Sequence, residues 1–233
     1  MLSTKPNTPR ESWGILVRNL LILLAIIGGI AYSAFPIALP LGLLSRPETR
    51  LAVFLVGSMV GEMVALLVLV WLLGRRGERL GDLGWGRPTT WQAILLGIVV
   101  ALGYSAVTAL NPAVGTNLLQ VSPLKALAII AALVAGIVEE VVFRGYAMTA
   151  LSRMGYGSLV QVSASGIAFA AAHLYGFASP ATFLAAQGFT LVLGITLGII
   201  YLVGRRSLTP VIVSHTLIDA IVEPWLLLSF FRL

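Results

Sequence analysis

The sequence contains no cysteine, and charged residues make up only 10% of it. Without cysteine, the protein has no disulfide, no thiolate nucleophile and no cysteine-bound metal. A soluble domain carries roughly one quarter charged residues, so this content is too low to cover the surface of a 233-residue protein with groups that water solvates. Lipid must therefore solvate much of the exterior, and a mean hydropathy of +0.98 agrees with this.

Acidic residues are scarcer than basic ones, and the formal net charge is +6. In a soluble protein this excess would suggest nucleic-acid binding. Here the Lys and Arg residues lie in short segments beside apolar stretches, which is the distribution that the positive-inside rule describes for membrane proteins. We therefore expect a lipid bilayer, and no nucleic acid, as the partner of this chain.

Long apolar stretches recur along the chain. A membrane-spanning helix needs about 20 mainly apolar residues, and seven stretches meet that length. They lie near residues 14–34, 51–73, 91–110, 124–148, 158–176, 181–203 and 208–230. The sequence predicts an all-α fold, a polytopic transmembrane helical bundle of about seven spans.

The distribution of Lys and Arg predicts the orientation of these spans. Counted on alternate sides, ten lie on the side of the N-terminus and four on the opposite side, with Arg144 inside a span. Cytoplasmic segments of membrane proteins carry the larger share of Lys and Arg. We expect a cytoplasmic N-terminus and a C-terminus on the opposite side.

Ionisable side chains within the spans are the candidates for function, because they are costly in a bilayer and usually face a bundle interior or a cavity. The main candidates are Glu139, Glu140 and Arg144 in the fourth span, His173 in the fifth, and His215 and Asp219 in the seventh. The two histidines are the only ones in the chain.

Helical geometry separates the two glutamates. Residues four apart share a helix face, so Glu140 lies next to Arg144, and we interpret this pair as mainly structural. Glu139 points about 100° away from Glu140. It has no partner within its own helix and is available for chemistry or for a ligand. His215 and Asp219 are also four residues apart and face one direction together.

Position along the helices indicates which of these groups meet. Glu139 precedes Gly155, in the turn between the fourth and fifth spans, by 16 residues, and His173 follows it by 18. The two therefore lie at similar depth in an antiparallel hairpin. His215 lies about two turns inside its span, so it joins them only if the helices are tilted or staggered. We predict that Glu139, His173 and His215 approach within roughly 8 Å around one cavity, the scale of two ligands bridged by one metal or water.

Two chemistries suit one carboxylate, two imidazoles and an acidic neighbour. In the first, Glu139, His173 and His215 hold a divalent metal such as zinc, which activates water. In the second, Glu139 is a general base and a histidine stabilises the oxyanion. Two interpretations without catalysis remain open at this point: a buried ion pair with packing histidines, or a path for protons or ions.

Other features of the spans have simpler interpretations. Glu62 in the second span is interpreted as a hydrogen-bonding group at a helix interface, and Glu223 near the end of the last span as an interfacial residue. The patterns Gly57-x-x-x-Gly61 and Gly194-x-x-x-Gly198 predict close helix packing.

Three motifs follow one another in the second half of the chain. They are Glu139-Glu140-x-x-x-Arg144-Gly, Phe169-x-x-x-His173 and His215-x-x-x-Asp219, each on a separate apolar stretch. In this order they resemble the CPBP intramembrane proteases, the CAAX-protease and bacteriocin-processing, or Abi, family, which is related to the eukaryotic CAAX prenyl endopeptidase. The resemblance covers about residues 124–223. It divides the chain into N-terminal spans one to three, at 1–123, and a CPBP-like catalytic core, at 124–233.

The resemblance implies a role for each matching residue. Glu139 takes the place of the family's catalytic glutamate, and His173 that of the histidine that activates water or binds metal with it. His215 and Asp219 match the pair that binds metal or forms the oxyanion site. Asp219 departs from the asparagine common in the family. An ionised aspartate donates no hydrogen bond, so the departure favours metal ligation and puts oxyanion donation in doubt.

Glu140 and Arg144 match the family's supporting pair. The resemblance implies an intramembrane endopeptidase, and a metalloprotease where the metal is bound, that hydrolyses membrane-associated or prenylated CAAX-type proteins. It also implies an integral protein of a prokaryotic cytoplasmic membrane, with eight spans if a peripheral helix is hidden at the predicted boundaries. The alternative is a non-catalytic transporter, or a scaffold or immunity protein, that uses the same polar cluster.

Overall fold

The computed structural model describes residues 12–173 and 180–231, and the regular elements in that part are helices. In chain order they are α1 (Trp13–Ala38), η1 (Leu39–Leu41), α2 (Pro47–Gly74), η2 (Leu80–Leu83), α3 (Trp91–Thr108), α4 (Pro112–Gly115), α5 (Pro123–Glu140), η3 (Val141–Ala147), α6 (Met148–Arg153), α7 (Ser158–Ala172), α8 (Pro180–Val203), α9 (Thr209–Val222) and α10 (Trp225–Phe231). Several are long and apolar enough to cross a membrane. The predicted all-α fold is confirmed, and the chain is an integral membrane protein.

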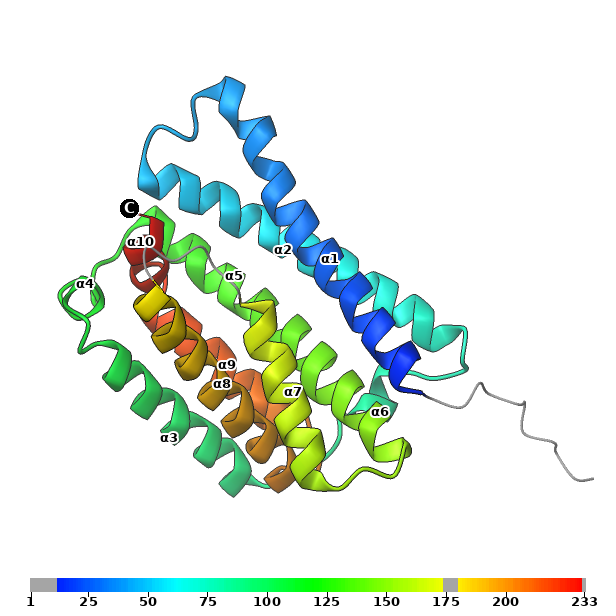
Figure 1. Ribbon diagram of the computed structural model, residues 1–233. Coiled ribbons are helices and arrows are strands. Elements are labelled where there is room, and N and C mark those ends of the chain that lie inside the picture. The colour runs from blue at the N-terminus through cyan, green and yellow to red at the C-terminus, as the bar shows by residue number, and fades with distance from the viewer. Residues whose placement is uncertain (1–11, 174–179, 232–233) are drawn as a thin grey trace, which may run out of the picture.

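The helices form a bundle in which α5 and α9 lie between outer helices (Figure 1). α1 and α2 pair along one side, and α2 packs on α5. α5 packs on α9, and α9 packs on α3 at the opposite side. α7 packs on α8, and both contact η3, the segment that follows α5. Packing therefore brings together α5, η3, α7 and α9, and the predicted site residues lie on these elements or directly after them.

Local side chains fix where several helices start. Ser12, Thr90 and Ser122 are the N-cap residues of α1, α3 and α5. Their hydroxyls accept hydrogen bonds from backbone N–H groups of the first turn, at 3.3, 3.3 and 3.1 Å. Pro123 takes the first position of α5, where its missing N–H costs nothing. These signals set the register of α5, and with it the position of Glu139.

The two small-xxx-small patterns lie at close helix contacts, as predicted. A Cβ atom added at Gly57 or Gly61 of α2 would lie 2.9 or 2.7 Å from a backbone carbonyl oxygen of α1. At Gly194 of α8, an added Cβ would lie 3.0 Å from the Cα of Gly166 in α7. Glycine is required at these positions because the backbones themselves are in contact, which is how transmembrane helices pack most closely.

α5, η3 and α6 form one continuous helical stretch of 31 residues, Pro123–Arg153. Its middle part, Val141–Ala147, is π-helical, and all seven of these residues are buried. π-Helical turns are rare and occur frequently at functional sites. This one begins directly after Glu139 and Glu140, the last two residues of α5. The regular α-helical backbone therefore ends at the two glutamates.

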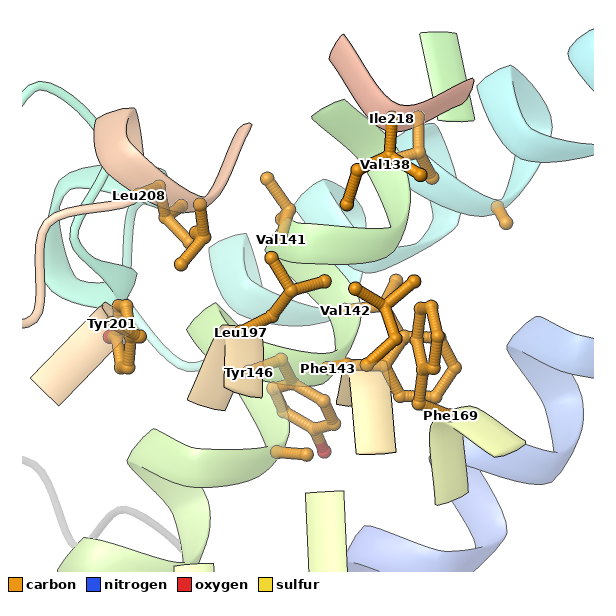
Figure 2. Packing of buried hydrophobic residues seen from close by; sticks show 14 of the residues in the cluster. Val138, Val141, Val142, Phe143, Tyr146, Phe169, Leu197, Tyr201, Leu208 and Ile218 are labelled. Atoms are coloured by element: carbon orange, nitrogen blue, oxygen red, sulfur yellow. The ribbon is translucent and has the colours of Figure 1, made fainter. Parts of the chain in front are cut away.

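A hydrophobic core surrounds the π-helical segment. Figure 2 shows Val142, Phe143 and Phe169 packed together, with Leu197 of α8 nearby and Ile218 of α9 beside Val138. The rings of Phe143 and Phe169 meet edge to face, with centroids 5.4 Å apart. In lipid, side chains of this size favour helix association through close van der Waals packing, because lipid chains are as apolar as leucine. This cluster therefore holds α7, α8 and α9 against the end of α5.

The predicted number of about seven spans is not confirmed. In the described part of the chain, five helices are long and apolar enough to cross a bilayer, namely Trp13–Leu41, Pro47–Gly74, Trp91–Thr108, Pro123–Arg153 and Phe183–Val203. The stretches predicted at 158–176 and 208–230 contain the shorter helices Ser158–Ala172 and Thr209–Val222. At 1.5 Å per residue these are about 21–23 Å long, less than the hydrocarbon core of about 30 Å.

The chain itself explains why these two stretches are interrupted. α7 ends where His173 adopts a non-helical backbone conformation, and positions 174–176 of the predicted span lie outside the described residues. α9 ends before Pro224, and a separate helix, α10, begins at Trp225. A proline has no backbone N–H and clashes with the preceding turn, so hydropathy alone joined two helices into one span. Neither seven nor eight spans is confirmed.

Candidate active site

Four of the predicted site residues line one cavity. Glu139, His173, His215 and Asp219 border a space of about 560 Å³ whose walls come from both halves of the chain. Glu139 is the last residue but one of α5, and His173 directly follows α7. His215 and Asp219 lie on successive turns of α9. Three helices that are distant in sequence thus bring these side chains to one place.

Glu139 lies between the two imidazoles and within 4 Å of each. Its Oε2 atom is 3.5 Å from Nε2 of His173 and 4.0 Å from Nε2 of His215. Both distances are well within the 8 Å scale expected for this group. Oε2 of Glu139 is buried and has no hydrogen-bond partner within the described protein. A carboxylate oxygen in that condition is poised to accept a hydrogen bond from a molecule in the cavity.

Glu140 points away from the cavity wall and forms two short contacts. Its Oε1 atom accepts a hydrogen bond from Nη1 of Arg144 at 2.8 Å and lies 2.8 Å from Nδ1 of His215. Glu140 and Arg144 are 0% exposed. The predicted pairing of Glu140 with Arg144 is present. Its interpretation as mainly structural is corrected in one respect, because Glu140 also contacts and orients His215, a partner on another helix.

The Nδ1 contacts fix the orientation of both rings. Nδ1 of His173 lies 2.8 Å from the backbone carbonyl of Phe169, and a carbonyl only accepts, so this nitrogen carries the proton. Nδ1 of His215 donates in the same way to Glu140, which already accepts from Arg144. In both rings Nε2 is therefore the atom that faces Glu139. A second hydrogen bond that fixes the tautomer is typical of functional histidines.

Phe169 packs against the polar groups. The guanidinium of Arg144 lies over its ring, 4.5 Å from the centroid. The rings of His173 and His215 lie 4.4 and 5.5 Å from it, centroid to centroid. Nη2 of Arg144 also donates to the carbonyl of Gly194 on α8 at 2.9 Å. One aromatic ring thus sets the spacing between the buried ion pair and both imidazoles.

Residues 121–221 match a protein family named Rce1-like, whose description is type II CAAX prenyl endopeptidase Rce1-like. The match covers less than half of the chain, and we call residues 121–221 the Rce1-like segment. The resemblance to the CPBP family, drawn from three motifs, is thereby confirmed, and all three motifs lie within the matched residues. At the level of the family, the match supports a CAAX-type intramembrane endopeptidase that acts on membrane proteins. The chain has no significant match among the curated proteins or the solved structures.

Asp219 of the Rce1-like segment stands beside His215. Its Oδ2 atom is 3.3 Å from Nε2 of His215, so His215 has Glu140 at one ring nitrogen and Asp219 at the other. Carboxylates on both sides of a ring stabilise a positive charge on it by Coulomb attraction. This environment suits a ring that donates from Nε2 to a developing negative charge.

The metal-binding prediction rests on Glu139, His173 and His215. Their donor atoms, one carboxylate oxygen and two imidazole nitrogens, are of the types that zinc prefers. Within the part of the chain that the structure describes, however, no three His, Cys, Asp or Glu side chains are arranged to hold a metal ion. We therefore derive no chemical step through a metal, and metal ligation by these residues stays a prediction.

The cavity also contains two acidic residues that sequence reasoning assigned elsewhere. Glu62 of α2, outside the Rce1-like segment, is 5% exposed and lines the cavity. Glu223, which follows α9, lines it too, so its interpretation as an interfacial residue is corrected. The sequence feature that could have placed Glu62 inside the bundle was its position next to Gly61. That glycine packs against α1, and this contact constrains which way the neighbouring side chain points.

Proposed function

We propose that this protein is an intramembrane endopeptidase in which Glu139 activates water for attack on a peptide bond. The observation that carries the proposal is the unpartnered Oε2 of Glu139 on the cavity wall, facing Nε2 of His173 and of His215. The match of residues 121–221 to the Rce1-like family supports it independently. The substrate class we propose is membrane-associated proteins, including those with a prenylated CAAX-type C-terminus.

The proposed reaction needs one base and one stabiliser of negative charge. Glu139 takes a proton from water, and the water oxygen bonds to the carbonyl carbon of the substrate. His173, with its Nδ1 proton held by the Phe169 carbonyl, accepts the second water hydrogen at Nε2 and orients the nucleophile. His215 donates from Nε2 to the oxyanion. Glu139 then gives its proton to the leaving nitrogen as the C–N bond breaks, which regenerates the carboxylate.

The buried pair supports this arrangement without touching the substrate. Glu140 fixes the ring of His215 through Nδ1, and Arg144 holds Glu140. A buried carboxylate is costly unless it is paired and hydrogen-bonded. Arg144 thus stabilises the charge that orients the histidine, and we assign both residues a positioning role.

The decisive experiment measures hydrolysis in lipid nanodiscs. Wild-type protein and Glu139→Gln are incubated with membrane-anchored peptides, half of them prenylated at a cysteine near the C-terminus, and products are identified by mass spectrometry. We expect cleavage by the wild type and almost none by the variant. Equal cleavage by both, or no cleavage of any peptide, would overturn the proposal.

A chelator arm separates the two chemistries for water activation. If Glu139 acts as a base without metal, cleavage continues in EDTA at the untreated rate. If zinc activates water, EDTA abolishes cleavage and added Zn²⁺ restores it. A transport assay tests the alternative function. The same protein is reconstituted into vesicles, where a proton or ion path across the membrane would pass current and a cavity that serves only catalysis would not.

A further inference from the structure

Glu62 is a buried carboxylate that the proposed mechanism does not use. It lies on α2, is 5% exposed and lines the same cavity as Glu139. Its Oε2 atom is buried and has no hydrogen-bond partner within the described protein. An unpaired carboxylate in an apolar setting is costly and is usually retained for a function. An oxygen in this position is open to a hydrogen bond from a molecule that enters the cavity.

Two further carboxylates share this part of the cavity. Asp219 and Glu223 line it together with Glu62. No Lys or Arg is among the described residues that line it. Lys125 donates from Nζ to the carbonyls of Ala220, Ile221 and Glu223 at the end of α9. Its hydrogen-bonding capacity is thus used by backbone groups.

Apolar side chains make up much of the remaining cavity wall. Ile27, Phe54 and Leu55 from the α1–α2 pair line it beside Glu62. Lys and Arg bury an aliphatic stem along apolar surface and present a charge at the tip. In a space of low dielectric, attraction between such a charge and a group of carboxylates is much stronger than in water. Apolar walls beside a group of carboxylates therefore suit a long cationic side chain.

We propose that Glu62, with Asp219 and Glu223, forms a subsite that binds the positively charged side chain of a Lys or Arg in the substrate. The inference rests on the proposed function, because the subsite would place the residue bearing that charge next to Glu139 and its histidines. It assigns the α1–α2 pair, which lies outside the Rce1-like match, a part in substrate selection.

Binding tests the subsite without requiring cleavage. The probes are membrane-anchored peptides in which a single Lys is moved through successive positions, each matched by a peptide with norleucine at that position. Affinities are measured by fluorescence polarisation for Glu139→Gln, alone and combined with Glu62→Gln. We expect at least one Lys position to bind more tightly than its match. Glu62→Gln should weaken that peptide about 10- to 100-fold, as expected for the loss of a hydrogen bond to a charged group.

Matched variants control for indirect effects. Glu48→Gln removes an exposed carboxylate from the same helix and should keep the wild-type preference for Lys. Glu62→Asp keeps the charge and should retain most of the preference. If Glu62→Gln does not fold, Glu223→Gln provides the same test from another element. The subsite is wrong if no Lys position binds more tightly than norleucine, or if the preference survives in both glutamine variants.

Cleavage by protein with an intact Glu139 separates the two proposals. A protease without this subsite would cleave Lys and norleucine peptides at equal kcat/KM, which overturns the further inference alone. Binding of Lys peptides without cleavage of any peptide overturns the proposed function and leaves a cation-selective cavity. We expect a higher kcat/KM for the Lys peptide, and Glu62→Gln should lower the ratio of the two values toward one.

Discussion

The α1–α2 pair and the Rce1-like segment build one cavity but differ in what surrounds them. In the most apolar window of α1, 11% of residues are buried, against 50% in Pro123–Arg153. α1 therefore mainly faces lipid, whereas the stretch from α5 to α6 is largely enclosed by other helices. The Rce1-like segment holds a fully buried ion pair, Glu140–Arg144, and the α1–α2 pair holds a buried glutamate whose Oε2 is unpartnered, Glu62.

This difference agrees with the proposed separation of chemistry from substrate selection. The proposed reacting groups lie in the segment that matches a protease family. α1 and α2 lie outside it, yet residues such as Ile27, Tyr32 and Phe54 form part of the cavity wall. A substrate that reaches Glu139 must therefore also contact helices that the family match does not cover. The division of the chain at residue 123 stays a prediction, since α2 packs on α5 and α3 on α9.

The largest expected effect concerns Glu139. Glu139→Gln keeps the shape of the side chain and removes the base, so peptide hydrolysis should fall by about 10²–10⁴-fold. The protein should still fold, because Oε2 of Glu139 forms no hydrogen bond within the described protein. Cleavage rates and the melting temperature in nanodiscs check both statements. A variant that cleaves at the wild-type rate would move the catalytic groups away from Glu139.

The next effect concerns stability of the Rce1-like segment. Arg144→Ala leaves Glu140 as an uncompensated buried charge, which should cost about 3–5 kcal/mol. Arg153→Ala is the control. Its ion pair with Glu78, at 2.8 Å, is partly exposed, with side chains 36% and 19% accessible, and such pairs are worth about 0–1 kcal/mol. Thermal unfolding in detergent measures both. Equal stability of the two variants would contradict the contrast between buried and exposed pairs.

A smaller effect on kinetics is expected when alanine replaces glycine at two helix interfaces, α5 with α9 and α2 with α1. At Gly136 of α5, an added Cβ would lie 3.0 Å from the backbone nitrogen of Thr216 on α9. At Gly57, it would lie 2.9 Å from the carbonyl of Ala31 on α1. Overpacking of this kind costs about 1–3 kcal/mol. We expect Gly136→Ala to lower kcat, because it shifts α9 and His215, and Gly57→Ala to raise KM, because it shifts only a cavity wall.

Steady-state kinetics with one membrane-anchored peptide test this contrast. Gly103→Ala in α3 is the control, because no atom lies within 4 Å of its added Cβ. Alanine is favoured over glycine within a helix by about 1 kcal/mol, so this variant should be as stable as the wild type or more so. If Gly136→Ala and Gly57→Ala change kcat equally, chemistry and selection are not separated between the two regions.

The smallest effect is expected at Asp219. Asp219→Asn replaces a carboxylate beside Nε2 of His215 by an amide that is able to donate a hydrogen bond. If His215 acts on the oxyanion without metal, hydrolysis should change by no more than about tenfold, the equivalent of one hydrogen bond. A metal-ligand role for Asp219 would instead give a large loss that added Zn²⁺ partly reverses. Activity measured against zinc concentration distinguishes the two.

Some contacts follow from helix geometry and were predictable. Glu140 and Arg144 meet because residues four apart share a face, and Gly57 and Gly61 mark a close interface because small residues are required there. The similar depth of Glu139 and His173 followed from their distances to one turn, and their side chains lie 3.5 Å apart.

Other features depended on how the helices pack. The contact of Glu140 with His215 joins residues 75 positions apart, and no periodicity within either helix encodes it. Glu62 reaches the cavity because α2 packs on α5, and hydropathy merged α9 and α10 into a single span. The sequence by itself determined the membrane environment, the helices and the ion pair within one helix, since composition and local geometry fix these. Only the tertiary structure decided which helix faces meet and which acids share a cavity, because helix packing in lipid depends on the complementarity of whole surfaces.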